Sequence, residues 1–226
     1  MKKIKVLFIF TLITTTSAVT SNNNPSYQKS VPLESNNSND SLISSENFKF
    51  AEKAFKFYNE TIDTSVVLQL IKVCDHYKLN KLQTFKMCVG QLLVESGGKH
   101  YKNGEVVVGS GGHIGMCQIS PKSGLAIMQK CVTDSEFSDF KVLTNDTTLV
   151  KPKSYSSSVT FLKDVDNNLT FWAYLLNRNI GSGSIEAALI KYNAGPGGYL
   201  SYINSGGSVN NHHYIRKIRA KLSKIN

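Results

Sequence analysis

The sequence lacks the signatures of the common membrane, nucleotide-binding and zinc-binding classes. After its N-terminal segment it has no apolar run of about 18 residues, the length that a membrane-spanning helix needs, so no membrane-spanning core is expected. It has no G-x-x-x-x-G-K-S/T loop, no H-E-x-x-H motif and no paired C-x-x-C. What remains is a globular composition, with 41% apolar residues in a chain of 226, which suffices for one domain with a real core.

The first 18 residues have the pattern of an export signal. Three lysines within residues 1–5 form a positive segment, and residues 6–13 are apolar except for one threonine. Thr16 and Ala18 then stand at the −3 and −1 positions of a cleavage site. Residues 1–18 are therefore predicted to be a secretory signal peptide, with a membrane anchor as the alternative. We expect the mature protein to be secreted, or periplasmic if the producer is a Gram-negative bacterium.

The chain is basic, with 26 Lys and Arg against 16 Asp and Glu, a formal net charge of +10. The charge stays positive after the signal peptide and its three lysines are removed. A basic exported protein suits an anionic polymer such as a bacterial cell wall. On charge alone it suits nucleic acid equally well.

Cysteine is scarce but even in number. The four are Cys74, Cys88, Cys117 and Cys131. In an exported chain they predict two disulfide bonds, and buried free thiols are the alternative. Three connectivities are possible. A helix over residues 121–130 would make a direct bond between Cys117 and Cys131 awkward.

The composition changes near residue 48. Residues 19–47 are rich in Ser and Asn without an apolar period, and they are predicted to be a disordered linker. From residue 48 to residue 226 helical periods dominate, which predicts one mainly α (α+β) domain with a small β excursion.

Local signals divide this domain into elements. Asn80, Asp166 and Ser184 are expected N-caps, and Gly97-Gly98 is an expected helix stop. Residues 99–112 are rich in glycine and favour a loop or a short hairpin, and residues 134–158 are polar and irregular. Helices are expected over residues 48–58, 64–77, 80–96, 121–130, 185–192 and 212–225, and from residue 166 onward.

Glu95 is the chemical candidate. It lies on the last turn of the helix over residues 80–96, at the edge of an apolar face that includes Cys88 and Leu92. The negative end of the helix and partial burial would both resist ionisation of the carboxyl group. A carboxylic acid with a raised pKa is what a general acid near neutral pH requires. A solvated surface glutamate is the plain alternative.

Four short motifs follow one another along the chain. They are Glu95-Ser96-Gly97, the segment Gly115-Met116-Cys117-Gln118-Ile119-Ser120-Pro121, the segment Lys191-Tyr192-Asn193-Ala194-Gly195-Pro196-Gly197, and Tyr214-Ile215. In this order they resemble the soluble lytic transglycosylase family, whose corresponding motifs include G-L-M-Q-I-x-P and A-Y-N-A-G-x-G. Goose-type lysozymes share that fold and much of the pattern. Cys117 stands where the family has Met, and Lys191 stands where it has Ala.

The resemblance implies a lysozyme-like fold over residues 48–226, with the hairpin beside a cleft that holds the glycan strands of peptidoglycan. Glu95 would first protonate the bond between N-acetylmuramic acid and N-acetylglucosamine and then act as a base, leaving a 1,6-anhydro end. Tyr214 would hold the Glu95 carboxyl group and help to keep it protonated. No cofactor, metal, nucleic acid or stable membrane anchor is implied, and a monomer is expected. The substrate-binding residues that the resemblance implies are Ser110, Gln118, Tyr192, Asn193 and Tyr214.

Three other functions fit parts of the sequence. A hydrolytic lysozyme of the inverting kind needs a second carboxylate, for which Glu105, Asp164 and Asp166 are candidates. A Cys–His enzyme could use Cys117 with His113 or His100. A binder of wall glycan or nucleic acid without catalysis could use the lysines and arginines of the last helix.

Overall fold

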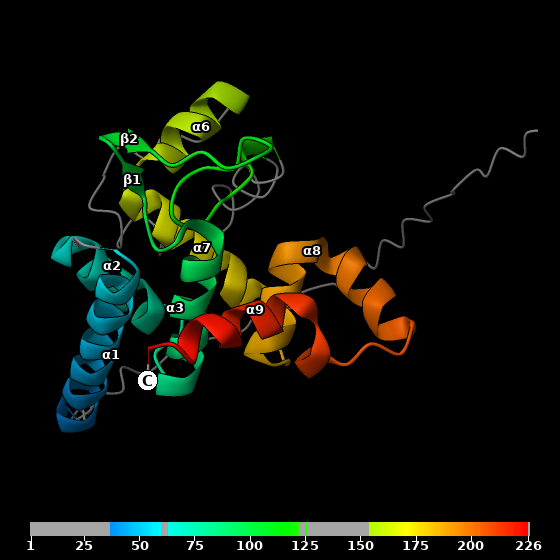
Figure 1. Cartoon of the computed structure of the whole chain (residues 1–226), viewed down its shortest axis with the longest axis horizontal. Coiled ribbons are helices and arrows are strands. Elements are labelled where there is room, and N and C mark those ends of the chain that lie inside the picture. The colour runs from blue at the N-terminus through cyan, green and yellow to red at the C-terminus, as the bar shows by residue number, and fades with distance from the viewer. Residues whose placement is uncertain (1–36, 60–62, 123–124, 126–153, 226) are drawn as a thin grey trace, which may run out of the picture. The chain divides into compact units, whose positions relative to one another are not determined.

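The computed structural model describes residues 37–59, 63–122, 125 and 154–225, and it describes side chains from residue 44 onward (Figure 1). This part of the chain is mainly helical with one two-stranded antiparallel sheet, which confirms the mainly α class. No helix in these ranges is long and apolar enough to cross a membrane. The elements are α1 (Asn37–Tyr58), α2 (Thr64–His76), α3 (Leu82–Ser96), β1 (Tyr101–Lys102), β2 (Glu105–Val106), α6 (Tyr155–Lys163), α7 (Val165–Ile180), α8 (Ile185–Asn204), η2 (Val209–Asn211) and α9 (His213–Leu222).

Helix α3 lies at the centre of the fold and packs against α1, α8 and α9. In Figure 1 it stands between α1 and α2 on one side and α8 and α9 on the other. Its buried apolar side chains include Phe85, Cys88, Val89, Leu92 and Leu93, the face that the periodicity predicts. The helix ends at Gly97 in the left-handed conformation (φ 69°), which glycine adopts at little cost, so the predicted stop is confirmed.

Helix α7 forms the second layer of the core, against α2, α6 and α8. Its apolar face is anchored by Trp172, which is fully buried. The predicted cap is displaced, because Asp164 rather than Asp166 accepts a hydrogen bond from the Asn167 backbone N–H (2.8 Å). Asp166 lies in the first turn instead, where a carboxylate also interacts favourably with the helix dipole.

The β excursion is a hairpin directly after α3. Strands β1 and β2 pair with Tyr101 opposite Val106 and Lys102 opposite Glu105. Asn103 and Gly104 both have positive φ (55° and 81°), as a two-residue Asn-Gly hairpin turn requires. The short hairpin expected within residues 99–112 is confirmed.

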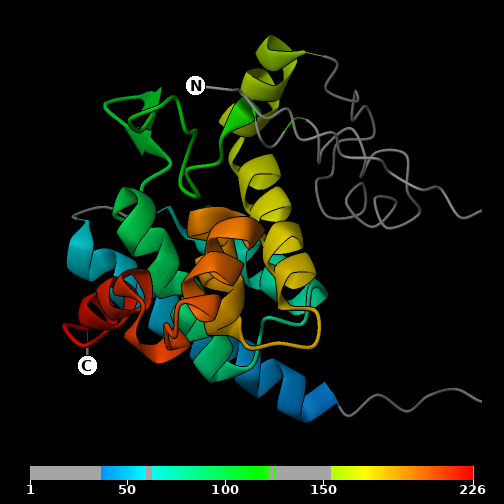
Figure 2. The ribbon, with the colours of Figure 1, turned by 90° about the vertical axis from the view of Figure 1, so that its right-hand side faces the viewer.

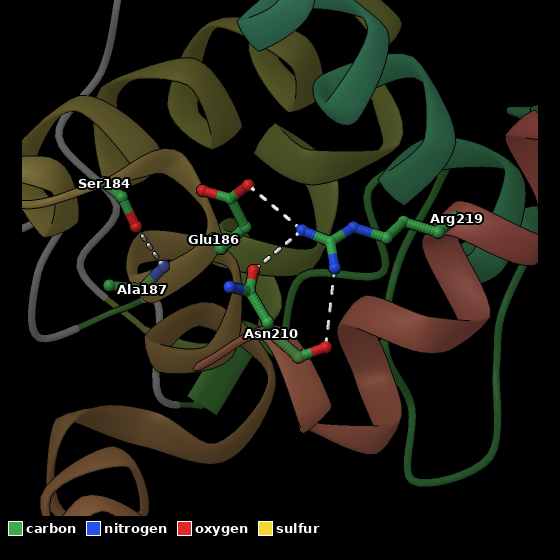
Figure 3. Close-up of polar contacts among 5 residues, drawn as sticks. All are labelled: Ser184, Glu186, Ala187, Asn210 and Arg219. Atoms are coloured by element: carbon green, nitrogen blue, oxygen red, sulfur yellow. Dashed lines mark hydrogen bonds and ion pairs between the residues drawn. The ribbon is translucent and has the colours of Figure 1, made fainter. Parts of the chain in front are cut away.

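The C-terminal part is joined by polar contacts among α8, η2 and α9 (Figure 3). Ser184 accepts a hydrogen bond from the Ala187 N–H (3.2 Å), which confirms this N-cap. Arg219 of α9 reaches Asn210 Oδ1 (2.9 Å) and Glu186 Oε1 (3.4 Å). Gly195 (φ 73°, ψ 161°) interrupts the helical backbone of α8 after Ala194, but a second helical stretch follows immediately to Asn204.

Several predicted boundaries are wrong. Helix α1 begins at Asn37 rather than at residue 48, so the linker predicted over residues 19–47 extends too far. Asn47, inside that predicted linker, is buried, and its side-chain amide donates to the Asn80 carbonyl (2.7 Å). That pairing and a bond to Asp75 occupy Asn80, and the N-cap of α3 is Lys81. Ser154 starts α6 through a capping box with Ser157, inside the stretch expected to be irregular. The helix expected over residues 121–130 lies mostly outside the described residues, as does the segment 126–153.

The cysteines contradict the expected disulfides. Cys74, Cys88 and Cys117 are free thiols, and each is fully buried. Cys74 of α2 and Cys88 of α3 lie against each other in the core, where a thiol packs as a small apolar side chain. The fourth, Cys131, lies outside the described residues. Export permits disulfide bonds but does not require them, and these three cysteines pack as thiols in the core instead.

Candidate active site

Glu95 is partly buried on the last turn of α3 and is held by a residue distant in sequence. The Tyr214 hydroxyl group at the start of α9 donates a hydrogen bond to Glu95 Oε1. The carboxyl group therefore has one oxygen engaged by a phenol, and Oε2 is left for other partners. The structure brings together the first and the last of the four sequence motifs.

Opposing effects act on the Glu95 pKa. Burial is the largest and raises the pKa; the Tyr214 hydrogen bond and the nearby Lys217 ammonium lower it. Burial prevails, so the pKa lies above its ordinary value, the direction that a general acid needs. The expectation that Tyr214 helps to keep the carboxyl group protonated is wrong in sign. A donated hydrogen bond stabilises the carboxylate, because the carboxylate is the stronger acceptor.

The start of α9 sets the position of Tyr214. His212 caps the helix, with Nδ1 accepting from the Tyr214 backbone N–H (3.3 Å), which makes Nε2 the protonated nitrogen in the neutral ring. Tyr214 itself is only 3% exposed. Close approach of α9 to α3 depends on Gly90, because a Cβ there would lie 2.7 Å from Ile218 Cγ2.

The second motif forms a tight loop whose backbone is anchored by buried side chains. Asn168 of α7 accepts from the Cys117 N–H (3.0 Å) and donates to the carbonyl groups of Ile114 (3.0 Å) and Leu162 (3.1 Å). His100 Nδ1 accepts from the Met116 N–H (3.2 Å). These bonds fix the loop against α7 and place the Cys117 carbonyl group where α8 can reach it.

Gly115 and Gln118 show why this loop needs its sequence. Gly115 has φ 73°, and a Cβ there would lie 2.6 Å from His100 Cε1 and 2.7 Å from Asn168 Nδ2. Gln118 has φ 52°, an uncommon conformation for a residue with a side chain, which is a feature of functional sites. Its side-chain amide donates to the Gly115 carbonyl (2.8 Å) and packs against Gly109. In this state Gln118 stabilises its own loop.

Tyr192 joins the third motif to the second. Its hydroxyl group donates to the Cys117 carbonyl (2.7 Å). Burial, and then the neighbouring Cys117, Glu95 and Tyr214, raise the pKa of Tyr192 well above its ordinary value. Tyr192 is therefore a neutral phenol that interacts electrostatically with Glu95, whereas Tyr214 bonds the carboxyl group directly.

Ser110 and Asn193 are not drawn into this cluster. Ser110 is exposed at the turn that closes where the Gly109 N–H bonds the His113 carbonyl (2.8 Å). Asn193 is exposed on α8 just before the interruption at Gly195. Neither side chain makes a hydrogen bond within the described part of the chain. Both are open to solvent, where a bound molecule could reach them.

The residues that would serve other chemistries are placed differently. Glu105 is exposed in β2, Asp164 caps α7, and no described carboxylate is among the groups that shift the Glu95 pKa. Cys117 is fully buried, and burial raises its thiol pKa well above the ordinary value, which opposes a thiolate nucleophile. His100 is hydrogen-bonded through both ring nitrogens, to the Met116 N–H and the Lys163 carbonyl.

Among the described residues, neither a metal site nor the cavity beside the hairpin includes Glu95. Among the described residues no group of three or more His, Cys, Asp or Glu side chains could hold a metal ion. A cavity of about 580 Å³ lies between the end of α1, the start of α2 and β1, and its lining includes Tyr58, His100 and Met116. Glu95, Tyr192 and Tyr214 are not among its lining residues, so the cavity is separate from the acid.

Three residues of the site were not predicted from the sequence. Gln91 and Asn168 are fully buried polar residues on helix faces that are otherwise apolar, and Lys217 is a cation close to Glu95. A polar residue at a core position of a helix was a signal for the first two, since buried amides are retained only where they find partners. Lys217 had no signal, because it belongs to a run of basic residues on α9.

No protein-family model, curated protein or solved structure matches this chain. The function is therefore argued from the geometry of the site. A partly buried carboxyl group with a raised pKa, held at one oxygen by a phenol, can give a proton to a bound substrate and take one back near neutral pH.

Proposed function

We propose that the protein is a peptidoglycan lytic transglycosylase with Glu95 as its only acid–base group. On this proposal it is exported and acts on bacterial cell walls, and its basic charge favours an anionic substrate. The domain would be lysozyme-like, with the glycan strand in a cleft beside the hairpin. Ser110, Gln118 and Asn193 would contact the sugars.

One observation carries the proposal, the hydrogen bond from Tyr214 to Glu95. The two residues are separated by most of the domain, and they belong to motifs that the resemblance to lytic transglycosylases assigns to one site. The bond between Tyr192 and the Cys117 carbonyl links the two middle motifs in the same way. Each of these two bonds joins motifs that are distant in the sequence, which supports the proposal of a shared site.

The geometry assigns a role to each oxygen of Glu95. Because Tyr214 donates to Oε1, the transferable proton of the neutral acid belongs on Oε2. That proton passes to the glycosidic oxygen as the C1–O bond breaks, and the acetamide of the same sugar stabilises the positive centre. The Glu95 carboxylate then removes the proton of the 6-hydroxyl group as O6 bonds to C1. Glu95 recovers its proton, and no water is consumed.

The competing hydrolase would direct water at the same centre, and its inverting form needs a second carboxylate about 6.5–9.5 Å away. A nearby like charge would raise the Glu95 pKa, yet burial is the only effect that raises it among the described groups. Within the described residues, this agrees with a mechanism that uses one carboxyl group.

Digestion of purified peptidoglycan followed by mass analysis of the muropeptides tests the reaction. We expect products that end in 1,6-anhydro sugars, lighter by one water molecule than hydrolysis products. Reducing ends in their place would identify a lysozyme, and release of neither product would overturn the proposal.

Glu95→Gln tests the residue, because the amide keeps the shape but carries no transferable acid proton. Loss of a general acid costs about 10²–10⁴ in rate, and here the same group is also the base, so the loss should reach at least the upper end. Glu105→Gln, in the exposed hairpin, is the control and should remain active. A Glu95→Gln variant that keeps a tenth of the wild-type rate would contradict the assignment.

A further inference from the structure

Gln91 is a fully buried amide one helical turn before Glu95. The two residues are four apart on α3, so they share a face of the helix, and Tyr214 of α9 meets that face at Glu95. A buried side-chain amide has two donors and an acceptor to satisfy, and leaving one unpaired costs about 1–3 kcal/mol. A residue so placed therefore needs a structural reason.

Trp172 of α7 determines the orientation of this amide. Its indole Nε1–H donates to Gln91 Oε1 at 2.8 Å, and both side chains are fully buried. An indole N–H can only donate, so the oxygen of the amide must face Trp172. The NH₂ group is then directed away from Trp172.

Tyr214 is the described side chain on which Gln91 acts electrostatically, and it contacts Glu95 one turn further along α3. Gln91 Nε2 is buried and has no hydrogen-bond partner among the described residues. Gln91 nevertheless lowers the pKa of Tyr214, against burial and Glu95, which raise it well above its ordinary value. A donor that faces the phenol oxygen acts in this direction, because it stabilises the phenolate.

We propose that Trp172 and Gln91 are positioning residues that fix the direction of the hydrogen bond between Tyr214 and Glu95. The Gln91 NH₂ occupies the oxygen side of the phenol, so the phenol proton must go to Glu95 Oε1. The order of donation is Trp172 to Gln91 to Tyr214 to Glu95. Each donor polarises the next, and the chain ends by stabilising the Glu95 carboxylate. We call these four residues and the hydrogen bonds between them the relay. Its role in catalysis rests on the proposed function of Glu95.

The other groups that act on Glu95 do not belong to this relay. Tyr192 of α8 and the thiol of Cys117 in the neighbouring loop have pKa values raised well above the ordinary ones, so both are neutral near pH 7. Lys217 of α9 is the described cation that acts on Glu95. None of the three is attached to Gln91, so a Gln91 variant changes the relay and leaves their charges in place.

The test is a carboxyl ¹³C NMR titration of Glu95 in the substrate-free protein. Gln91→Met keeps the length of the side chain but removes its donors, and we expect the Glu95 pKa to rise. In a Tyr214→Phe background the same change should have no effect, because the relay is already cut. Gln69→Met is the matched control, since Gln69 is also buried but bonds Thr170 (3.5 Å) far along α2 and α7. It should leave the titration of Glu95 unchanged.

An unchanged Glu95 titration in Gln91→Met would overturn the relay, and so would an equal shift in the Tyr214→Phe background. If Gln91→Met does not fold, the wild-type protein supplies the answer. The Gln91 NH₂ and Trp172 Nε1–H resonances should shift with the Glu95 titration and lose that shift in Glu95→Gln. Gln91 NH₂ and Trp172 Nε1–H resonances that do not shift as Glu95 titrates would refute the proposal. These measurements need no activity, so the relay and the lytic function can fail independently.

Discussion

At the residue scale, the environment of Glu95 is a balance between burial and two neighbours that favour its charge. Burial raises the Glu95 pKa, whereas the Tyr214 hydrogen bond and the Lys217 ammonium lower it and so limit the rise. This balance suits a group that must give a proton and then accept one.

Tyr214→Phe tests the sign of this balance. Removing the donated hydrogen bond should raise the Glu95 pKa further, so the acid stays protonated to higher pH. The alkaline limb of kcat/KM should therefore move to higher pH, while the maximal rate falls at least several-fold because Glu95 loses its anchor. The measurement is a pH–rate profile on soluble glycan strands. An alkaline limb that moves to lower pH would show that the phenol stabilises the protonated acid instead.

Several residues of the candidate site could be predicted from the sequence, but the hydrogen bonds that connect them could not. Glu95, Tyr192 and Tyr214 could be selected because they stand in motifs that resemble those of the lytic transglycosylase family. Gln91 and Asn168 act through other residues, and their roles depend on which elements meet in space. The sign of the Tyr214 effect also required the geometry, because a phenol can donate to a carboxylate or accept from a carboxylic acid.

At the scale of elements, the approach of α9 to α3 places Tyr214 on Glu95. Gly90 is unfavourable in a helix interior by about 1 kcal/mol relative to alanine, yet its missing side chain admits Ile218 and Leu222. The sequence alone does not show why glycine stands at this position, because the helix that packs against it lies more than a hundred residues further along the chain.

Gly90→Val should force α9 outward. A Cβ at this position would lie 2.7 Å from Ile218 Cγ2 and 2.9 Å from Leu222 Cγ, and overpacking of this kind costs about 1–3 kcal/mol. We expect a lower melting temperature and, because Tyr214 moves with α9, reduced activity. Gly197→Val in α8 is the control for stability, since a Cβ there meets nothing within 4 Å. Equal melting temperatures for the two variants would show that the contact is not restrictive.

Helix positions were predictable where apolar periodicity and a stop signal agreed, as for α3 and Gly97. They were less predictable where a polar residue had two possible roles. Asn80 has the side chain of an N-cap, but it bonds Asp75 and receives the Asn47 amide, so tertiary contacts override the local preference. The N-terminal half of α1 is polar, and no period in the sequence distinguishes it from a linker.

At the scale of the whole molecule, the cysteines bear on how a chain of this size is stabilised. Cys74, Cys88 and Cys117 are all part of one core cluster that also contains Trp172 and Phe85. A domain of this length buries enough apolar surface to fold without cross-links.

Thiol titration without a reducing agent checks this directly. In a Cys131→Ser variant the native protein should not react with a thiol reagent, because the other three cysteines are fully buried. After denaturation all three should react. Fewer than three thiols in the denatured protein would reveal a disulfide and restore the expectation drawn from export.

The last prediction concerns the pH dependence of folding stability, to which the ionisation of Glu95 contributes. Burial raises the pKa of Glu95 in the folded protein above its unfolded value of about 4.3, so between these two values the folded state holds more protons. The contribution of Glu95 to stability is thus fully present below the unfolded pKa and is lost as pH rises through the folded pKa. Glu95→Gln cannot ionise and escapes this loss, while its amide oxygen can still accept from Tyr214. The melting temperature of the variant relative to wild type should therefore increase from acidic to neutral pH and then level off. Other titrating groups, His100 among them, act on both proteins and cancel. A difference that stays constant over this range would mean that Glu95 is as well solvated in the folded chain as in the unfolded one, and the basis for its acid role would be lost.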